Sequence, residues 1–322
     1  MVETRLLCID RVPGRALPLG LRERAPPGAS GRPPVLLVHG ATLGGALFDL
    51  PRAGYSLMDA LAATGRTVYA VDVRGYGLSV GGGVMDRPPE ANPPFAGADM
   101  VVDDIATAVS FIRERCAVAA VDLLGFSWGT ITAARYAAAH PRTVRRLALY
   151  APLYAELNPL WLGRIADPRD RSRLAPAFGA WRLVTAASLI ERWNGDLPAG
   201  DALQFREDGI AALMFDAIAG LDPTSASRSP PAFRCPNGAL ADMVKVFNGQ
   251  ALYDPAKLPM PLLVVRGEHD TTSTDTDARR LLARAGASEK RYRIVPGASH
   301  FLCIERAREA LYDELNLFLG PD

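Results

Sequence analysis

The sequence predicts an α/β fold with a mostly parallel, twisted sheet, helices on both faces of that sheet, and an inserted helical segment. Two observations support this prediction. Short apolar runs, the pattern of buried strands, alternate with helical stretches in the first half of the chain and again near its end. Between residues 153 and 257 this alternation stops. We therefore expect a core of residues 1–152 and 258–322, with a helical cap, or lid, over residues 153–257.

The first 34 residues predict an antiparallel lead-in to the sheet. Arg5 to Asp10 and Ala16 to Arg24 have the composition of two strands, and Pro13-Gly14 is typical of the turn between them. The stretch from residue 25 to residue 34 is rich in Pro and Gly and predicts a loop.

The first buried strand of the core is expected at residues 35–38, which read Val-Leu-Leu-Val. It runs into His39-Gly40-Ala41, followed by further glycines. Glycine after a buried strand allows a backbone N–H to point inward, as an oxyanion-binding loop requires. We expect His39 to brace this loop through hydrogen bonds rather than to react with a substrate.

A second buried strand at residues 67–71 leads to Asp72 and Arg74, which we interpret as an ion pair within a turn. Residues 80–98 are rich in Gly and Pro and predict a loop long enough to border a pocket. Helical periodicity follows from Ala98 to Arg115. The face of this helix toward the sheet is expected to comprise Met100, Ile105, Val109 and Ile112.

The rest of the chain is organised around the pentapeptide Gly125-Phe-Ser-Trp-Gly129. An apolar run at residues 121–124 precedes it, and a helical stretch at residues 130–139 follows it. G-x-S-x-G between a strand and a helix predicts a nucleophile elbow, with Ser127 on a strained turn at the end of the sheet. The helix is expected to end at His140-Pro141, because proline cannot continue it.

Within residues 153–257 the clearest helix is expected from Ala202 to Gly220. This segment is more apolar than solvent-facing helices would be, so we expect some of its side chains to line a pocket facing Ser127. The candidates are Trp161, Trp181, Trp193, Phe205, Leu213, Met214 and Phe215. The segment also carries arginines at positions 164, 169, 171, 173, 182, 192, 206, 228 and 234. Most are expected at the surface, and one or two are candidates for binding a carboxylate in the pocket.

The remaining elements of the core flank this segment. Buried strands are expected at residues 146–151, 261–265 and 291–295, and helices from Asp275 to Ala285 and from Ile304 to Leu319. The strand at 261–265 leads to Asp270, and the strand at 291–295 leads to His300.

Ser127, Asp270 and His300 each follow the carboxyl end of a predicted parallel strand, which is the edge where ligand sites form in open α/β sheets. A serine hydroxyl needs a base beside it, and histidine can take its proton near neutral pH and pass it to the leaving group. An aspartate fixes the tautomer of the imidazole and stabilises its charged form. These three residues therefore predict a catalytic triad.

The sequence resembles the α/β-hydrolase superfamily over residues 35–152 and 258–320. The matching motifs are His39-Gly40, the elbow from Gly125 to Gly129, Gly267-Glu-His-Asp270 and Gly297-Ala-Ser-His300, in the chain order Ser, Asp, His. The resemblance implies that the backbone N–H groups of Ala41 and Trp128 form the oxyanion hole. It also implies the fold of that superfamily, a mostly parallel sheet with an inserted cap.

The acid position departs from the pattern of many members, because no proline follows Asp270 at close range. Glu156, Asp275 and Asp277 are therefore rival acids. His269 is adjacent to Asp270 and is expected to be structural, since neighbouring loop residues usually point apart. Cys303 lacks an elbow and is expected to serve packing.

The predicted reaction is acyl transfer to water, in which Ser127 attacks a carbonyl and water then releases the acid. A serine at the elbow argues against a haloalkane dehalogenase or an epoxide hydrolase, for which the resemblance to the superfamily would imply an aspartate at this position. A carboxylic-ester hydrolase is the leading interpretation. Proline-iminopeptidase-like amide hydrolysis stays open, because Ser127-Trp-Gly129 and Ala139-His-Pro141 resemble that branch. Carbon–carbon bond hydrolysis stays open too, as does a non-catalytic ligand-binding protein on the same fold.

Composition narrows the class of partner. The 322 residues carry a net charge of +1, which gives no general attraction to nucleic acid or anionic membranes. The four cysteines form no C-x-x-C pair and no cofactor motif occurs, so we expect neither metal nor cofactor. Without a signal-peptide pattern or an apolar run of transmembrane length, the expectation is a cytoplasmic protein acting on a small-molecule ester. A half-ester of a dicarboxylic acid, such as a monoalkyl phthalate, would suit both an apolar pocket and an arginine.

Overall fold

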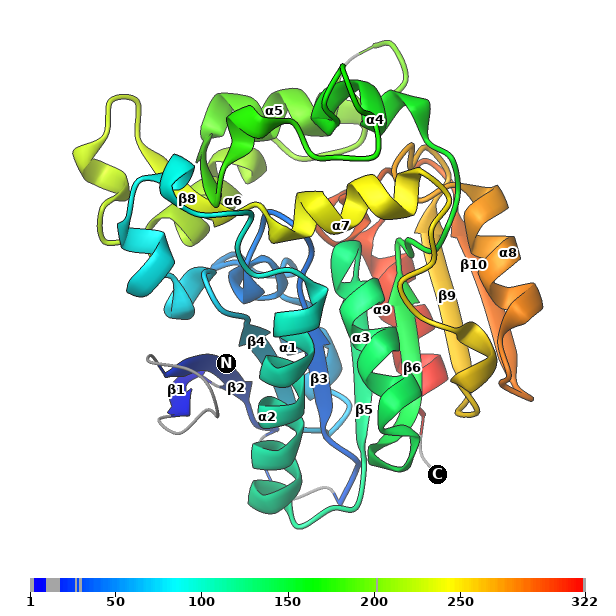
Figure 1. Ribbon diagram of the computed structural model, residues 1–322. Helices are drawn as coiled ribbons and strands as arrows, with labels where there is room; N and C mark the ends of the chain where they lie inside the picture. Colours follow the sequence, from blue (N-terminus) through cyan, green and yellow to red (C-terminus); the bar gives the residue numbers. More distant parts are fainter. Residues whose placement is uncertain (1–2, 10–17, 27, 29–30, 201, 321–322) are drawn as a thin grey trace.

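The computed structural model describes residues 3–9, 18–26, 28, 31–200 and 202–320 (Figure 1). Its centre is an eight-stranded sheet with the strand order β1-β2-β4-β3-β5-β6-β9-β10. The strands are β1 (Arg5–Ile9), β2 (Leu19–Arg24), β3 (Val35–Val38), β4 (Val68–Asp72), β5 (Val121–Phe126), β6 (Val144–Tyr150), β9 (Leu262–Gly267) and β10 (Lys290–Val295). The strands from β4 to β10 in this order are parallel, whereas β2 is antiparallel to both β1 and β4.

The register of the parallel strands brings their carboxyl ends to one edge. Val38 at the end of β3 pairs with Gly125 of β5, and Val295 at the end of β10 pairs with Gly267 at the end of β9. The loops that follow these strands therefore meet above the same edge of the sheet. This alignment places the segments after residues 38, 126, 267 and 295 close together.

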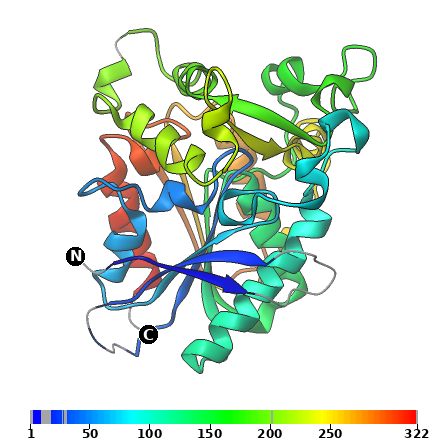
Figure 2. The same cartoon turned by 90° about the vertical axis from the view of Figure 1, so that its left-hand side faces the viewer.

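Helices cover both faces of the sheet. α2 (Ala98–Cys116) and α3 (Trp128–Ala139) pack side by side on one face, and α1 (Leu57–Ala62) and α9 (Arg308–Leu319) pack together on the other (Figures 1 and 2). α8 (Asp275–Arg284) connects β9 to β10. The central strands are buried on both faces, which explains why they read as continuous apolar runs rather than alternating ones.

Residues 153–257, between β6 and β9, lie above the carboxyl edge of the sheet (Figure 1). We refer to this segment as the insert. It contains the helices α4 (Pro159–Ile165), α5 (Ala186–Asn194), α6 (Ile210–Ala219) and α7 (Gly238–Phe247). It also contains two strands, β7 (Trp181–Thr185) and β8 (Ala232–Pro236), which pair with each other in antiparallel register.

The antiparallel pair β7 and β8 corrects the expectation of a segment without buried strands. All five residues of β8 are buried. The strand was not recognisable in the sequence because Arg234 interrupts its apolar pattern and Pro236 ends it. Arg234 is tolerated there because it pairs with Asp222, with 2.9 Å between Nη2 and Oδ1.

Two expected helices begin later than the periodicity predicts. The helix expected from residue 202 is interrupted, because only Ala202–Gln204 form a short 3₁₀ turn and α6 starts at Ile210. Gly209, directly before α6, has a φ of 75°, a left-handed conformation that separates the two pieces. At the end of the chain, Leu302–Ile304 form a separate 3₁₀ turn before α9.

Three smaller expectations have different outcomes. β1 and β2 form the expected antiparallel pair, while the turn expected at residues 13–14 lies outside the described residues. Met100 is 38% exposed and does not face the sheet, unlike the other apolar residues expected on that side of α2.

Asp72 and Arg74 do not form the ion pair with each other that their spacing predicts. Asp72 binds Arg22 of β2, with 2.5 Å between Oδ2 and Nη1, and Arg74 binds Asp104 of α2, with 2.7 Å between Nη2 and Oδ1. Both partners come from segments at least 30 residues away along the chain. Local spacing therefore identified the charged residues of this turn but not their partners.

Candidate active site

Ser127 lies at the turn between β5 and α3. Its backbone angles, φ 55° and ψ −124°, are rare for a residue with a side chain, so the turn holds it in a strained conformation. Two close approaches explain the flanking glycines. A Cβ atom on Gly125 would lie 2.4 Å from the carbonyl oxygen of Gly129, and one on Gly129 would lie 2.4 Å from the carbonyl oxygen of His39. The elbow can therefore form only with glycine at both positions.

A continuous chain of hydrogen bonds joins three residues that the sequence singles out. His300 Nδ1 lies 2.8 Å from Asp270 Oδ2, and His300 Nε2 lies 2.9 Å from Ser127 Oγ. An ionised carboxylate only accepts hydrogen bonds, so the Nδ1–H group donates to Asp270. In the neutral imidazole Nε2 then carries the lone pair, and the Ser127 hydroxyl donates to it. This arrangement can move a proton from the serine oxygen to the imidazole.

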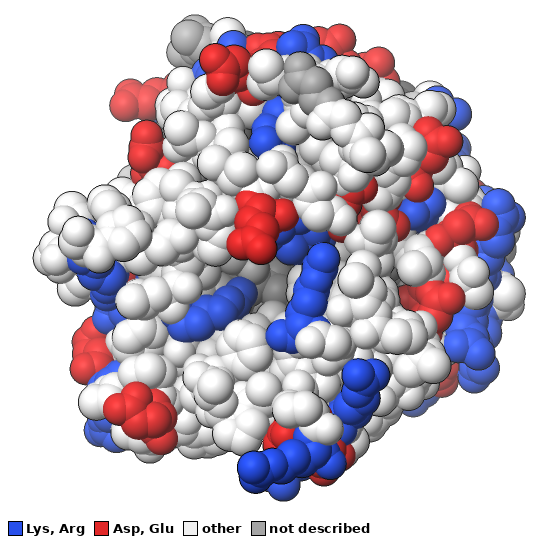
Figure 3. All heavy atoms as spheres, turned by 90° about the horizontal axis from the view of Figure 1, so that it is seen from above, with Lys and Arg blue, Asp and Glu red and all other residues white. Residues whose placement is uncertain are grey.

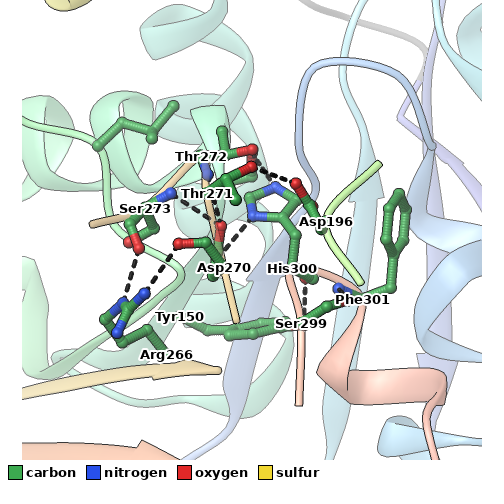
Figure 4. A network of polar contacts seen from close by, with 12 residues as sticks. Tyr150, Asp196, Arg266, Asp270, Thr271, Thr272, Ser273, Ser299, His300 and Phe301 are labelled. Carbon is green, nitrogen blue, oxygen red and sulfur yellow. Dashed lines mark hydrogen bonds and ion pairs between the residues drawn. The ribbon is translucent and has the colours of Figure 1, made fainter. Parts of the chain in front are cut away.

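Two backbone amides hold the Asp270 carboxylate (Figure 4). Its Oδ1 accepts the N–H of Thr272 at 2.9 Å and that of Ser273 at 2.8 Å. Burial alone would raise the pKa of Asp270, but the His300 ring, the Ser273 amide and Arg266 together hold that pKa below its usual range. Arg266 also donates to the backbone carbonyl of Asp270 at 2.8 Å, and this bond fixes the loop between the two residues. Asp270 is therefore ionised at neutral pH.

The three rival acids have other partners. Glu156 accepts a hydrogen bond from a threonine hydroxyl, and Asp275 pairs with an arginine of its own helix, α8. Asp277 is buried and accepts the backbone N–H groups of Tyr154 and Ala155 at the start of the insert, at 2.7 and 2.9 Å. Within the described residues, Asp270 is the carboxylate bonded to the imidazole of His300.

His39 holds the loop that follows β3. Its Nε2 accepts the Val73 N–H at 3.2 Å, so its Nδ1–H donates to the carbonyl of Gly40 at 2.9 Å. Burial lowers the pKa of His39, and the ring is neutral. Because the peptide group is planar and trans, the N–H of Ala41 points away from the anchored Gly40 carbonyl. The hydroxyl of Tyr76 donates to the next carbonyl, that of Ala41, at 3.0 Å.

Ser127 and His300 line a pocket of about 260 Å³ between the sheet edge and the insert. The insert supplies mostly apolar walls: Trp161, Ile165, Phe178, Leu183, Val184, Leu189, Leu240 and Met243. Arg182 of β7 and Arg192 of α5 also line it. Seen from above, a hollow with basic side chains beside it opens on this face of the molecule (Figure 3).

Of the insert residues expected to line this pocket, Trp161 is the one found among its described lining residues. Trp193 and Met214 are fully buried in the packing of the insert, and Phe205 meets His269 edge-on with ring centroids 5.6 Å apart. The prediction that these side chains line the pocket was based on residue type alone. Most of them pack against other parts of the protein rather than facing the pocket. The Gly- and Pro-rich loop at residues 80–98 does not contribute to the described lining either.

Glu305 is a fully buried acid that no pattern in the sequence indicates. Its carboxyl group accepts the indole N–H of Trp193 at 2.7 Å and the backbone N–H of Ser299 at 2.7 Å, and burial raises its pKa. The hydroxyl of Tyr150 donates to the carbonyl of His300 at 2.7 Å. These groups fix the segment that carries the histidine. No local pattern marks Glu305 or Tyr150 for this role, because Trp193 lies 112 positions from Glu305 and His300 lies 150 positions from Tyr150.

A second polar cluster fixes the loop that carries Asp270. Asp196, just after α5, accepts a hydrogen bond from the hydroxyl of Thr271 (Figure 4). It also pairs with Arg192, with 2.7 Å between Oδ2 and Nη1. Thr272 accepts hydrogen bonds from Arg192 and from the indole of Trp161, the latter at 3.0 Å. The insert therefore contacts the acid loop directly through side chains of α4 and α5.

The other candidate side chains lie apart from this chain of hydrogen bonds. His269 lies beside Phe205 and Glu268, and burial raises the pKa of the Cys303 thiol to about 12, so that thiol stays protonated. Within the described ranges, no group of three or more His, Cys, Asp or Glu side chains is arranged to hold a metal ion. The helices of the described residues include none that is long and apolar enough to cross a membrane.

A mostly parallel sheet with a serine elbow and a hydrogen-bonded histidine at its carboxyl edge is the architecture of an α/β hydrolase. Comparison with known families agrees. The family model described as serine aminopeptidase, S33, matches residues 32–307, and the chain belongs to this family of hydrolases.

One curated relative is the abhydrolase domain-containing protein abhd-5.2 of Caenorhabditis elegans, which is 27% identical over 189 residues. The match covers 54% of this chain and 36% of that protein, so it spans only about a third of the length of the relative.

Solved structures share the fold over nearly the whole chain. An E-2-(acetamidomethylene)succinate hydrolase has a TM-score of 0.62 at 22% identity, with 99% of both chains covered. A serine hydrolase from the polyaromatic-hydrocarbon-degrading bacterium Cycloclasticus zankles has a TM-score of 0.63 at 18% identity, with 98% of both chains covered. An enol-lactonase from Burkholderia xenovorans has a TM-score of 0.61 at 18% identity, covering 96% of this chain and 98% of that chain. At these identities the likeness establishes the fold alone.

Proposed function

We propose that the protein is a carboxylic-ester hydrolase that works through an acyl-enzyme on Ser127. The observation that carries this proposal is the unbroken chain of hydrogen bonds from Ser127 through His300 to the ionised Asp270, at the side of a mostly apolar pocket. A serine that donates to a neutral imidazole is activated for attack on a carbonyl carbon. A non-catalytic binding protein would not need this arrangement.

In the first half of the reaction, Ser127 Oγ attacks the ester carbonyl while its proton passes to His300 Nε2. The carbonyl π electrons move to the oxygen and give a tetrahedral oxyanion. Asp270 stabilises the imidazolium through the bond at Nδ1. When the oxyanion collapses, the bond to the alcohol oxygen breaks, and the imidazolium gives its proton to the departing alcohol.

In the second half, a water molecule attacks the acyl group on Ser127 while His300 takes one of its protons. Collapse of this second oxyanion breaks the bond to Ser127 Oγ and returns the proton from His300 to the serine. The products are the free acid and an unchanged enzyme.

The backbone N–H groups of Ala41 and Trp128 are the oxyanion-hole donors in this proposal. The Ala41 amide is oriented by the anchored carbonyl of Gly40, which accepts from His39. Trp128 is the first residue of α3, so its N–H belongs to the unpaired amides at the positive end of a twelve-residue helix. Donors fixed before the reaction stabilise the developing charge without reorganisation.

The insert acts as a cap over Ser127 in this account. Its support is that α4, β7, α5 and α7 supply pocket walls opposite the elbow. Substrate selection would then depend mainly on insert residues, and bond cleavage on the loops of the core.

The pocket favours an ester over the N-terminal amine of a peptide, despite the description of the family model. Binding a protonated amine calls for a carboxylate, and among the described residues that line the pocket none is Asp or Glu. Two arginines line it instead. A half-ester of a dicarboxylic acid, such as a monoalkyl phthalate, combines an apolar part with a charge that complements these side chains.

A hydrolysis panel tests the proposal. It contains aryl and alkyl esters of increasing acyl length, half-esters, lactones, an aminoacyl anilide and a vinylogous diketone. We expect turnover of esters that is lost in Ser127→Ala. Turnover of the anilide or the diketone without turnover of any ester would contradict ester hydrolysis, and an inactive wild-type protein across the whole panel would contradict catalysis.

A further inference from the structure

Arg182, on β7, brings a positive charge to the pocket without an acidic partner. Its Nη1 donates to the carbonyl of Pro236 at 3.1 Å and to Oδ1 of Asn237 at 2.8 Å. Its Nη2 donates to Oγ1 of Thr42 at 2.9 Å and to the carbonyl of Ala41 at 3.4 Å. All four acceptors are neutral. Within the described part of the chain, no Asp or Glu pairs with this guanidinium.

The other arginine of the pocket differs in this respect. Arg192 pairs with Asp196 at 2.7 Å, and its guanidinium lies over the ring of Trp161, 4.8 Å from the centroid. Its charge is therefore compensated within the protein. Arg234 of β8, which is also buried, pairs with Asp222 at 2.9 Å. Arg182 is thus the lining arginine whose charge no described acid balances.

The surroundings of Arg182 favour an anion. The described lining residues are mostly apolar and include no acid, so no anionic side chain of the described lining competes with a ligand for the guanidinium. A partly buried charge without a counter-ion is costly, and a carboxylate that binds it gains charge-assisted hydrogen bonds. The four existing bonds fix the planar group, which lowers the entropy lost when a ligand binds. Its Nε–H makes no hydrogen bond to any described residue and is left as a donor.

We propose that Arg182 binds a carboxylate of the substrate, so that the preferred substrates are esters that carry a negative charge. This inference rests on the proposed ester hydrolysis and identifies the residue that binds the charged group of the substrate. Because Arg182 contacts Ala41 and Thr42, the carboxylate lies beside the loop proposed to hold the ester carbonyl oxygen. The ester group reaches Ser127, and the apolar part of the molecule contacts the walls from the insert.

Two esters of matched size test this selection. 4-Acetoxybenzoate is anionic, and 4-acetoxybenzamide is its neutral isostere; the rate of each is corrected for its reactivity with hydroxide. For the wild type we expect a kcat/KM about tenfold higher for the anionic ester. Arg182→Gln, which keeps an amide donor but removes the charge, should reduce this preference to near unity, and Arg182→Lys should retain part of it.

Arg169→Gln is the matched control, because Arg169 is an exposed arginine of the insert that is not among the described lining residues of the pocket. It should keep the wild-type preference, which excludes a general effect of net charge. If Arg182→Gln lowers both esters by the same factor, Arg182 only braces the loop at Ala41 and the inference is wrong. A wild type without preference for the anionic ester would also overturn it.

A binding measurement tests the carboxylate site at Arg182 independently of the proposed ester hydrolysis. Calorimetry on the Ser127→Ala protein uses 4-acetamidobenzoate, a stable amide analogue, and the corresponding benzamide. We expect the benzoate to bind about tenfold more tightly, and this difference to vanish when Arg182→Gln is added. Arg182-dependent binding without turnover of any ester would reject ester hydrolysis and keep the carboxylate site. Ester turnover without such binding would keep the reaction and reject the site.

Discussion

Trp193 of the insert donates its indole N–H to the buried carboxyl group of Glu305 at 2.7 Å, although 112 positions separate them in the sequence. Glu305 also accepts the backbone N–H of Ser299, the residue before His300. A helix of the insert, α5, is therefore tied to the segment that carries the histidine. Asp196, just after α5, pairs with Arg192 and accepts a hydrogen bond from Thr271 in the loop that carries Asp270. This contact is a second link between the same end of α5 and the core. The position of α5 and the geometry around His300 are thus linked.

Trp193→Phe should weaken this link. The change removes the indole donor and leaves a gap at a fully buried position, so we expect a loss of unfolding free energy on the order of 2–4 kcal/mol. Because Glu305 positions the segment of His300, kcat should fall for esters of every size while KM changes less. Urea denaturation and steady-state kinetics on the same preparation measure the two effects.

Trp181→Phe is the control for this change. Trp181 is also an insert tryptophan, and its indole donates to the carbonyl of Arg87 at 3.0 Å, away from the histidine segment. It should lose some stability and keep the wild-type kcat. A Trp193→Phe enzyme that keeps its kcat would show that the link to Glu305 is structural only.

Asp270→Asn should lower kcat/KM about a thousandfold or more, because asparagine cannot stabilise the imidazolium and favours the wrong tautomer. Asp275→Asn is the matched control, since Asp275 lies on α8 and pairs with Arg279 rather than with His300. It should remain close to wild type. Near-normal kinetics of Asp270→Asn together with a crippled Asp275 or Glu156 variant would mean that the acid is assigned wrongly.

The lowered pKa of Asp270 predicts a pH dependence of stability. A carboxyl group whose pKa is lower in the folded than in the unfolded chain adds stability above the unfolded value, about 3.9 for aspartate. That contribution disappears as the pH falls through the lower pKa of the folded state. The unfolding free energy of wild type minus that of Asp270→Asn should therefore shrink as the pH falls below about 5. A difference that grows on acidification below about pH 5 would contradict the direction of the shift.

Leu183→Ala should change the choice of acyl group more than it changes stability. Leu183 lines the pocket from β7 and is 48% exposed, so its truncation leaves the packing of the insert almost intact. We expect kcat/KM for a hexanoate ester to fall about fivefold relative to an acetate ester, which corresponds to about 1 kcal/mol of lost apolar contact. Leu160→Ala, at 49% exposure on α4 but outside the pocket lining, should leave this ratio unchanged. Equal losses for both esters in Leu183→Ala would indicate a role in stability.

The sheet and the three hydrogen-bonded residues were predictable because their signals are local. Buried parallel strands read as apolar runs, and a serine, an aspartate and a histidine each follow such a run. The partners of Asp72 and Arg74 were not predictable, since those ion pairs depend on which strand and helix come to lie beside the turn.

The insert was harder to predict for a related reason. Trp193 and Trp161 have the same residue type, yet one is buried against Glu305 and Phe301 and the other lines the pocket. Which of them faces a substrate depends on how α4 and α5 pack over the core, and amphipathic periodicity does not specify that packing. Arg182 likewise stood among nine insert arginines until the fold placed it beside Ala41.

Active-site labelling identifies the nucleophile without assuming a substrate. Wild-type protein is treated with a fluorophosphonate and digested, and the modified peptide is mapped by mass spectrometry, with Ser127→Ala and, as a control at an exposed serine of the insert, Ser172→Ala treated in parallel. We predict a single adduct on Ser127, in wild type and in Ser172→Ala, and none in Ser127→Ala, whose ester hydrolysis falls about a thousandfold or more. An adduct on another residue, or a Ser127→Ala protein that is still labelled and hydrolyses esters at the wild-type rate, would show that Ser127 is not the nucleophile.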